Sequence, residues 1–122
     1  MQLIQLNGIQ LKMLIQSGDT PKDLTFIEHS IPPIHVLVRS MDLRHNLVDV
    51  IWAFPYFIQK NTQITGACGF KDAPKNSRIE IGYNVAPDAR GLGIATAAVK
   101  QLSQIAFAST LVNTVFALMV NN

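Results

Sequence analysis

The chain has 122 residues, of which 48% are hydrophobic and 15% are charged, and its formal net charge is +2. This length predicts a single domain over residues 1–122, with enough apolar side chains for a buried core. The small net charge provides no basic surface for phosphate backbones, which argues against a nucleic-acid-binding protein and leaves only a mild attraction for anionic ligands.

The ends of the chain and its cysteine indicate the compartment. The N-terminus, Met1 to Gln5, lacks the basic start and the long apolar run of a signal peptide. The single Cys68 excludes an intrachain disulfide and has no partners spaced for a metal site, which suits a reducing cytoplasm. Gln101 to Asn122 carries no charge, but polar residues interrupt it. We therefore predict a buried helix and strand there and a cytoplasmic protein; a membrane-associated protein is the alternative.

The first 50 residues are expected to be mainly helical. Leu3 to Leu6 fits a short edge strand, after which Asn7 caps a helix that runs to Gln16 and ends at Ser17-Gly18. Thr20-Pro21-Lys22-Asp23 has the composition of a second helix start, with a capping hydroxyl, a proline at the first position and an acid in the first turn.

Pro32 and Pro33 end that second helix, and a third helix is expected to follow. Its buried side is marked by the apolar residues Ile34, Leu37, Val38, Met41 and Val48. From Trp52 the pattern changes, because residues 56–59 and 64–70 flank a polar turn and predict a β-hairpin. Residues 1–50 are thus the N-terminal helical part of the domain, and residues 52–122 are its core.

A strand, a turn and a helix start come next, and they carry most of the functional information. From Arg78 to Val85 polar and apolar residues alternate, which predicts a strand whose apolar face includes Tyr83 as a core residue. Residues 88–93 form a turn, and apolar residues at helical spacing continue from Leu92 to about Ala108. The composition of residues 112–120 predicts a last strand. A right-handed crossover would place it parallel to the strand from Arg78 to Val85.

The glycine-rich turn at the helix start is a candidate anion site. The first N–H groups of a helix lack intrahelical partners and carry the positive end of the dipole. Gly91 and Gly93 allow a phosphate to approach the main chain closely, and Arg90 adds a positive charge. A P-loop is excluded because Ile94-Ala95 stands where Lys and Ser or Thr are required, and a dinucleotide fingerprint is excluded at Thr96.

The hexapeptide Arg90-Gly91-Leu92-Gly93-Ile94-Ala95 fits the acetyl-coenzyme A motif of the GNAT acetyltransferase superfamily. In that motif Arg or Gln, two variable residues, Gly, one variable residue and Gly or Ala follow a strand. Glu80-Ile81-Gly82-Tyr83 upstream and Ala95-Thr96 followed by Ala98-Val99 resemble one branch of the superfamily. The resemblance runs from about Gly66 to Ala108. It implies an α/β fold, with a mixed, mostly antiparallel sheet and flanking helices.

Members of the superfamily continue with a further helix and two more strands, and their frequent general acid, a tyrosine, lies on that segment. The sequence from residue 1 to residue 122 does not include it. The resemblance therefore implies a truncated chain, a natural fragment or a swapped homodimer. In such a dimer the second copy would cover the exposed edge of the 112–120 strand.

The resemblance implies acetyl-CoA as co-substrate and no metal. The pyrophosphate would lie on the turn, and the pantetheine arm would lie beside the end of the strand as an extra strand. The cofactor-binding residues implied are Val85, Arg90, Gly91, Leu92, Gly93, Ile94, Ala95 and Thr96. The alternatives are an ordinary helix-start turn for the glycines and a solvated surface cation for Arg90.

Acetyl transfer requires an unprotonated amine, although a free alkyl amine has a pKa of about 10, so a base is expected. Glu80 is the candidate catalytic base, because it lies next to Gly82, whose missing side chain opens room for a substrate, and it matches a glutamate used this way in parts of the superfamily. The alternative is a carboxylate that pairs with Arg78 or Lys71 on a wet face.

We therefore predict an N-acetyltransferase that passes acetyl from acetyl-CoA to a primary amine of a small molecule or a protein, by direct attack. The alternative is a catalytically incomplete coenzyme A-binding fragment or subunit that needs a partner. The acceptor amine is expected between the first helices and residues 66–83. His29, His35 and His45 have no metal-site or triad spacing, and each is expected to be structural or exposed.

Overall fold

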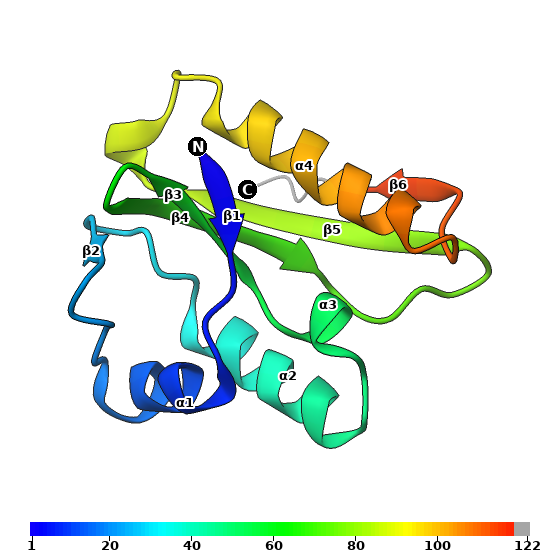
Figure 1. Cartoon of the computed structure of the whole chain (residues 1–122), viewed down its shortest axis with the longest axis horizontal. Helices are drawn as coiled ribbons and strands as arrows, with labels where there is room; N and C mark the ends of the chain where they lie inside the picture. Colours follow the sequence, from blue (N-terminus) through cyan, green and yellow to red (C-terminus); the bar gives the residue numbers. More distant parts are fainter. Residues whose placement is uncertain (119–122) are drawn as a thin grey trace.

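The computed structural model describes residues 1–118 and consists of a mixed sheet flanked by helices (Figure 1). In chain order the elements are β1 (Gln2–Ile4), α1 (Gly8–Ser17), β2 (Thr25–Phe26), α2 (Ile34–His45), α3 (Val50–Ala53), β3 (Tyr56–Lys60), β4 (Gln63–Phe70), β5 (Arg78–Val85), η1 (Pro87–Ala89), α4 (Ile94–Ala108) and β6 (Thr114–Phe116). The described strands lie in the order β1-β3-β4-β5-β6, and β2 pairs with β4 outside this path. This architecture confirms the predicted α/β fold.

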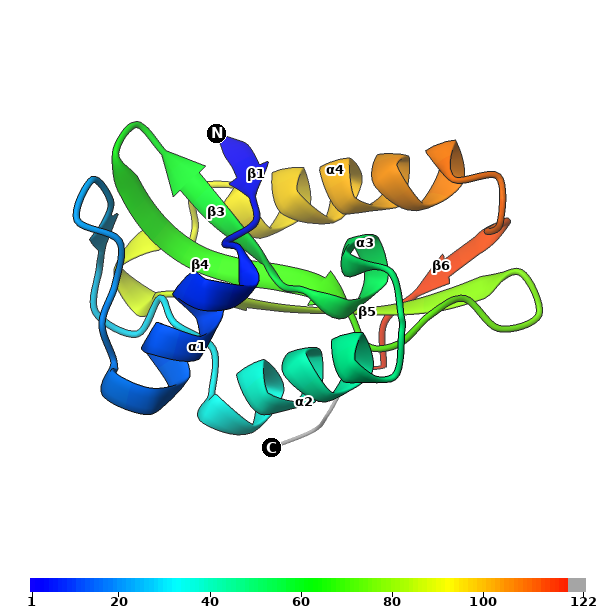
Figure 2. The ribbon, with the colours of Figure 1, turned by 60° about the horizontal axis from the view of Figure 1, so that its bottom comes forward.

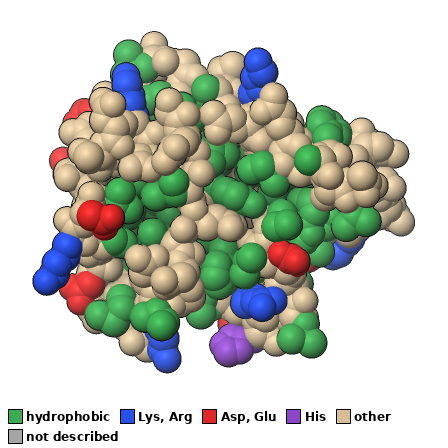
Figure 3. All heavy atoms as spheres, viewed as in Figure 1, with side chains coloured by type: hydrophobic (Ala, Val, Ile, Leu, Met, Phe, Trp, Pro, Cys, Tyr) green, Lys and Arg blue, Asp and Glu red, His purple; other side chains and the backbone are tan. Residues whose placement is uncertain are grey.

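The helices form two layers, with α4 on one face of the sheet and α1 and α2 on the other (Figure 1 and Figure 2). Beneath α4 the core includes Ile79 and Ile81 of β5 with Ala98 and Leu102 of the helix. On the other face it includes Leu11, Leu14 and Leu37 with Phe57 and Ile64. Seen in space-filling form, hydrophobic side chains occupy much of the middle of this view and the charged ones lie mainly toward its margins (Figure 3).

The central strands have the predicted connections. β3 and β4 form the predicted hairpin, and β4 pairs antiparallel with β5, which spans the predicted residues. β6 runs parallel to β5, with Arg78, Ile79 and Glu80 opposite Thr114, Val115 and Phe116. The predicted last strand is thus confirmed over residues 114–116, but it is shorter than predicted, because residues 112, 113, 117 and 118 are not part of a strand. Its residues 119 and 120 lie outside the described part of the chain.

The N-terminal strand and helix are also confirmed. β1 lies at one end of the strand order and pairs antiparallel with β3. Asn7 begins α1 with a reciprocal cap, because its Oδ1 accepts from the Gln10 N–H at 2.8 Å and its own N–H donates to Gln10 Oε1 at 2.9 Å. Gly18 ends the helix in the left-handed conformation, with φ +69°.

The predicted helix start at Thr20 is wrong. Residues 25 and 26 instead form β2, which pairs parallel with β4. Main-chain bonds from Thr25 N–H to Thr62 O and from Ile27 N–H to Ile64 O hold it there, at 3.0 and 3.1 Å. Phe26 packs edge-on against Phe57. Pairing with an existing strand and burial of this aromatic ring outweigh a local helix-start signal.

The third helix is confirmed as α2, but its buried side is narrower than predicted. Leu37 is buried, whereas Ile34 and Val38 are 61% and 40% exposed. The helix ends at His45, and Leu47 then takes a positive φ, so Val48 lies beyond the helix. In the described residues no helix is long and apolar enough to cross a membrane.

Candidate active site

The turn before α4 depends on two glycines in the left-handed backbone region. Gly91 has φ +80°, and Gly93, the N-cap residue of α4, has φ +72°. A Cβ built on either residue meets no other atom within 4 Å. Glycine is therefore favoured here by the backbone conformation rather than by crowding, and the space in front of the turn is open.

Six consecutive main-chain N–H groups, from Gly91 to Thr96, donate to no acceptor in the described chain. The first donor of the helix is the Ala97 N–H, which bonds to Gly93 O at 3.0 Å. Gly93 has no side chain to cap the helix. These unpaired donors lie at the positive end of the 15-residue helix α4, which makes the turn a binding site for an anion.

Arg90 ties this turn to the strand before it. Its Nε donates to the main-chain oxygen of Val85 at 3.1 Å, and the residue remains exposed. The side chain therefore closes the loop between β5 and the turn, and it places a positive charge beside the unpaired N–H groups.

One edge of β5 is open over its second half. Among the described strands β6 pairs only with residues 78–80. Glu80 O accepts from Lys71 N–H and Ala86 N–H donates to Thr65 O, so the even-numbered residues of β5 use their main-chain groups toward β4. Strand alternation turns the main-chain groups of Tyr83 and Val85 toward the open edge. Because the Val85 oxygen already accepts from Arg90 Nε, the main-chain groups of Tyr83 and the N–H of Val85 are the ones open to an extended ligand.

A cleft of about 500 Å³, here called the turn cleft, joins these features. It is lined by Tyr83, Asn84, Val85, Ala89, Arg90, Gly91, Gly93, Ile94, Ala95 and Thr96. The structure thus brings together all the predicted cofactor residues except Leu92, whose side chain is 63% exposed outside this lining.

Tyr83 is not a core residue, which corrects the prediction. It is 55% exposed, although Ile79, Ile81 and Val85 on the same strand face are buried. β6 ends its pairing at Glu80, and Tyr83 lies past that point at the turn cleft. Alternation identifies the face on which a side chain lies, but it does not show what covers that face.

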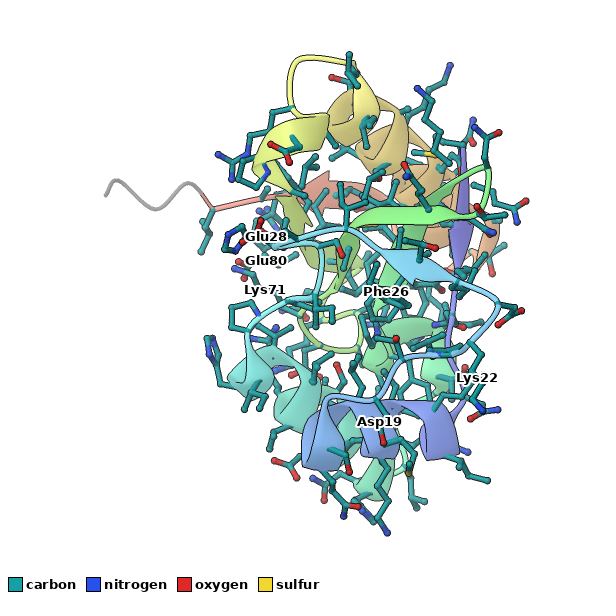
Figure 4. The ribbon with its side chains drawn as sticks, turned by 90° about the vertical axis from the view of Figure 1, so that its left-hand side faces the viewer. Asp19, Lys22, Phe26, Glu28, Lys71 and Glu80 are labelled. Carbon is teal, nitrogen blue, oxygen red and sulfur yellow. The ribbon has the colours of Figure 1, made fainter. Side chains whose placement is uncertain are left out.

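Glu80 is held in an ion pair. Its Oε2 is buried, lies 2.7 Å from Lys71 Nζ and has no hydrogen-bond partner among the described residues. Figure 4 shows Lys71 and Glu80 together at one side of the molecule. Glu80 lines neither the turn cleft nor the cavity described next. It borders a separate hollow, which Lys71, Arg78 and Phe116 also line.

A second cavity, of about 160 Å³, lies between α2 and the sheet and is here called the α2 cavity. Its lining includes Pro32, Pro33, Val36 and Arg39 from the α2 side and Gly82, Tyr83 and Asn84 from β5. Tyr83 and Asn84 also line the turn cleft. The two spaces therefore meet at the same two residues of β5.

The α2 cavity lies where an acceptor site was predicted, and Lys71 forms part of its wall. A Cβ on Gly82 would lie 3.3 Å from the Lys71 Cε. The missing side chain of Gly82 thus leaves room for Lys71 as well as for the cavity.

Cys68 also lines the α2 cavity, but it is not a nucleophile. It is 4% exposed, and burial raises the pKa of its thiol to about 12. The thiolate, which is the reactive form, is therefore scarce at neutral pH.

All three histidines are exposed, as predicted. His29 Nε2 lies 3.4 Å from Glu28 Oε1, and both side chains are exposed. His35 and His45 are exposed residues of α2. No group of three or more His, Cys, Asp or Glu residues within residues 1–118 is arranged to hold a metal ion.

A family model described as an acetyltransferase (GNAT) domain matches residues 29–122, which is most of the chain. The chain belongs to this family. The match confirms the resemblance drawn from residues 66–108 and identifies the domain as that of an acyltransferase family. A search of curated proteins finds no match.

Solved GNAT structures share the fold. A predicted acetyltransferase with acetyl-CoA from Clostridium acetobutylicum has 18% identity and a TM-score of 0.57, covering 98% of this chain and 81% of that one. An aminoglycoside 6'-N-acetyltransferase from Acinetobacter haemolyticus has 14% identity and a TM-score of 0.59, covering 100% and 81%. A ribosomal-protein-alanine N-acetyltransferase from Brucella melitensis has 14% identity and a TM-score of 0.55, covering 91% and 70%. At these identities the similarity concerns the fold alone.

Proposed function

We propose that this GNAT domain is an N-acetyltransferase that passes acetyl from acetyl-CoA to a primary amine of a small molecule or a protein. The observation that carries the proposal is the run of six unpaired N–H groups, Gly91 to Thr96, beside the open half of β5. The run suits a pyrophosphate, and the open main-chain groups of Tyr83 with the N–H of Val85 suit the amides of a pantetheine arm. The solved relative with acetyl-CoA supports this choice of ligand.

In this proposal the cofactor-binding residues are Val85, Arg90, Gly91, Leu92, Gly93, Ile94, Ala95 and Thr96. Most contacts come from the main chain, so the amino-acid types matter chiefly through the space that they leave open. Arg90 adds a charge while it remains bonded to Val85 O. Leu92 contributes its N–H group, because its side chain lies outside the cleft lining.

The acetyl group would meet the acceptor where the turn cleft and the α2 cavity share Tyr83 and Asn84. The amine nitrogen attacks the thioester carbon directly, the C–N bond forms, and the C–S bond breaks to release coenzyme A. The buried thiol of Cys68 argues against an acetyl-cysteine intermediate, because its raised pKa of about 12 leaves little thiolate.

Glu80 remains our proposed base for the attacking amine. Its partner Lys71 lines the α2 cavity. Gly82, which lies two residues after Glu80 on the same face of β5, lines this cavity too. The carboxylate would therefore receive the proton through water across Gly82 rather than by direct contact.

The proposal is tested by titrating the chain with acetyl-CoA in a calorimeter and then measuring release of the coenzyme A thiol with a panel of primary amines. Saturable binding with amine-dependent release is the expected result. Binding without release from any amine would favour the alternative, a coenzyme-binding subunit that needs a partner. Absence of binding would contradict both. A cytoplasmic location and a homodimer stay predictions from the sequence.

A further inference from the structure

We propose that the acceptor is a small primary amine that also carries an anionic group, and that Arg39 recognises this group. The inference deepens the proposed function and rests on it, because it takes the α2 cavity as the acceptor site. It starts from the charges in the wall of that cavity, which are Arg39 and Lys71, both cationic, with no carboxylate among the lining residues.

The two cations differ in what they are free to bind. Lys71 lies 2.7 Å from Glu80 Oε2, so its charge is already balanced. Arg39 is exposed and forms none of the ion pairs found among residues 1–118. A guanidinium binds carboxylate and phosphate through parallel N–H donors, so Arg39 is suited to an anionic group of the acceptor.

Glu80 is bound to Lys71, and neither of two other acidic residues, Asp42 and Glu28, lines the cavity. Asp42, one turn further along α2, lines a different hollow with α1. Glu28 is 82% exposed and faces His29 rather than the cavity lining. A polycationic acceptor would thus meet the unbalanced positive charge of Arg39 and no carboxylate among the lining residues.

The size and the apolar walls of the cavity limit the rest of the molecule. At about 160 Å³ it is smaller than a typical site for a drug-sized ligand, and Pro32, Pro33 and Pro55 line it with Phe70. An amine on a short aliphatic chain fits, with its anionic group at the exposed rim where Arg39 lies.

Four acceptors of similar length test the proposal. They are γ-aminobutyrate, 3-aminopropyl phosphate, n-butylamine and putrescine, which end in a carboxylate, a phosphate, a methyl group and a second amine. We expect kcat/KM to be at least about 10-fold higher for one of the two anionic amines than for putrescine. The free energy of one charge-assisted hydrogen bond corresponds to a factor of about that size. Comparison of the carboxylate with the phosphate identifies which anion is preferred.

The variant Arg39→Glu is expected to reverse the order of γ-aminobutyrate and putrescine. Arg44→Glu is the matched control, because Arg44 lies on the same helix, is exposed and lines no part of the α2 cavity. The control is expected to keep the wild-type order. A preference for putrescine in the wild type, or an order that Arg39→Glu leaves unchanged, would overturn the proposal.

Binding of the same amines without coenzyme separates this inference from the proposed function. The amide signals of Gly82 and Asn84 in an NMR titration report on the α2 cavity whether or not acetyl is transferred. Shifts with an anionic amine and none with putrescine would support the inference even if none of the four amines is acetylated. The lack of acetylation would then count against the proposed function alone. The opposite pattern of shifts would overturn the inference.

Discussion

The two halves of β5 differ in what lies along their edges. Residues 78–80 pair with β6 on one side, and on the other side Arg78 and Glu80 bond to Lys75 and Lys71 of the loop after β4. In the described chain residues 81–85 pair with β4 alone. Glu80 in the first half is bound to Lys71, while Tyr83 in the second half is 55% exposed. The unpaired N–H groups before α4 lie beside the second half.

This difference shows how one strand can provide both stability and a binding site. The doubly paired half fixes the position of the strand in the sheet, because its main-chain groups have partners on both edges. The half paired on one edge keeps main-chain donors and acceptors for a ligand. The predictions below test whether ligand binding and chemistry follow this division.

The largest effect is expected for Gly93→Val. A branched side chain at φ +72° would lie in front of the unpaired N–H groups, and we expect affinity for acetyl-CoA to fall at least about 100-fold. The left-handed conformation costs an L-residue about 1–2 kcal/mol, and a Cβ there meets no atom within 4 Å, so the fold should remain. Calorimetry measures the affinity, and circular dichroism measures the fold.

Gly18→Val is the matched control for this change. Gly18 also has a positive φ, +69°, with no atom within 4 Å of an added Cβ, but it lies at the end of α1 and outside the turn cleft. It should lose similar stability and keep its affinity for acetyl-CoA. Equal affinity in both variants would show that the turn is only a helix start.

A smaller effect is expected for Glu80→Gln. Because general base catalysis contributes about 10²-fold or more, kcat should fall by about that factor while affinity for acetyl-CoA is unchanged. Asp72→Asn provides the control, since it removes another carboxylate that pairs with a lysine, at 3.2 Å from Lys75. If kcat is unchanged in Glu80→Gln, Glu80 has a structural role only, and the doubly paired half of β5 takes no part in the chemistry.

The smallest effect on transfer is expected for Cys68→Ala, on the strand opposite Tyr83. Transfer should stay within about twofold of wild type, because the thiol with a pKa of about 12 is not a nucleophile. Stability should fall by about 1–2 kcal/mol from the lost buried atoms. Steady-state kinetics and urea unfolding measure the two quantities, and a loss of transfer with intact coenzyme binding would contradict the direct-attack mechanism.

The same thiol gives a pH dependence to wild-type stability. Its pKa is raised in the folded state, so the folded state disfavours the thiolate. The contribution of Cys68 to stability is therefore complete below its unfolded pKa of about 8.5, and it is lost as the pH rises toward about 12. Compared with Cys68→Ala, the wild type should lose additional stability across this range in urea unfolding.

Much of the fold could be predicted from local patterns. Alternation placed β5 correctly, and the glycines placed the start of α4 within two residues, because both signals depend on neighbouring residues alone. The strand β2 was missed, since it pairs with residues of β4 that lie 38 positions further along the chain. The exposure of Tyr83 was missed for the same reason, because it follows from where β6 stops and not from the sequence of β5.

The candidate site was predictable to a similar extent. The predicted cofactor residues include all those that line the turn cleft except Tyr83, Asn84 and Ala89, since most of the lining comes from one short segment. The α2 cavity was predictable only as a region, because Arg39, Lys71 and Gly82 come from three separate elements or loops. The sequence left Arg78 and Lys71 as alternative partners of Glu80. The structure pairs Glu80 with Lys71, whose side chain passes close to Gly82.

The most direct test of the divided strand is an NMR titration of the ¹⁵N-labelled chain with acetyl-CoA. We predict that the amide signals of Tyr83, Val85 and residues 91–96 shift in a saturable way, whereas that of Ile79 does not. Saturation with shifts at Ile79 and none at residues 91–96 would place the coenzyme elsewhere and contradict the proposed site. Absence of any saturable shift would contradict coenzyme binding by this chain.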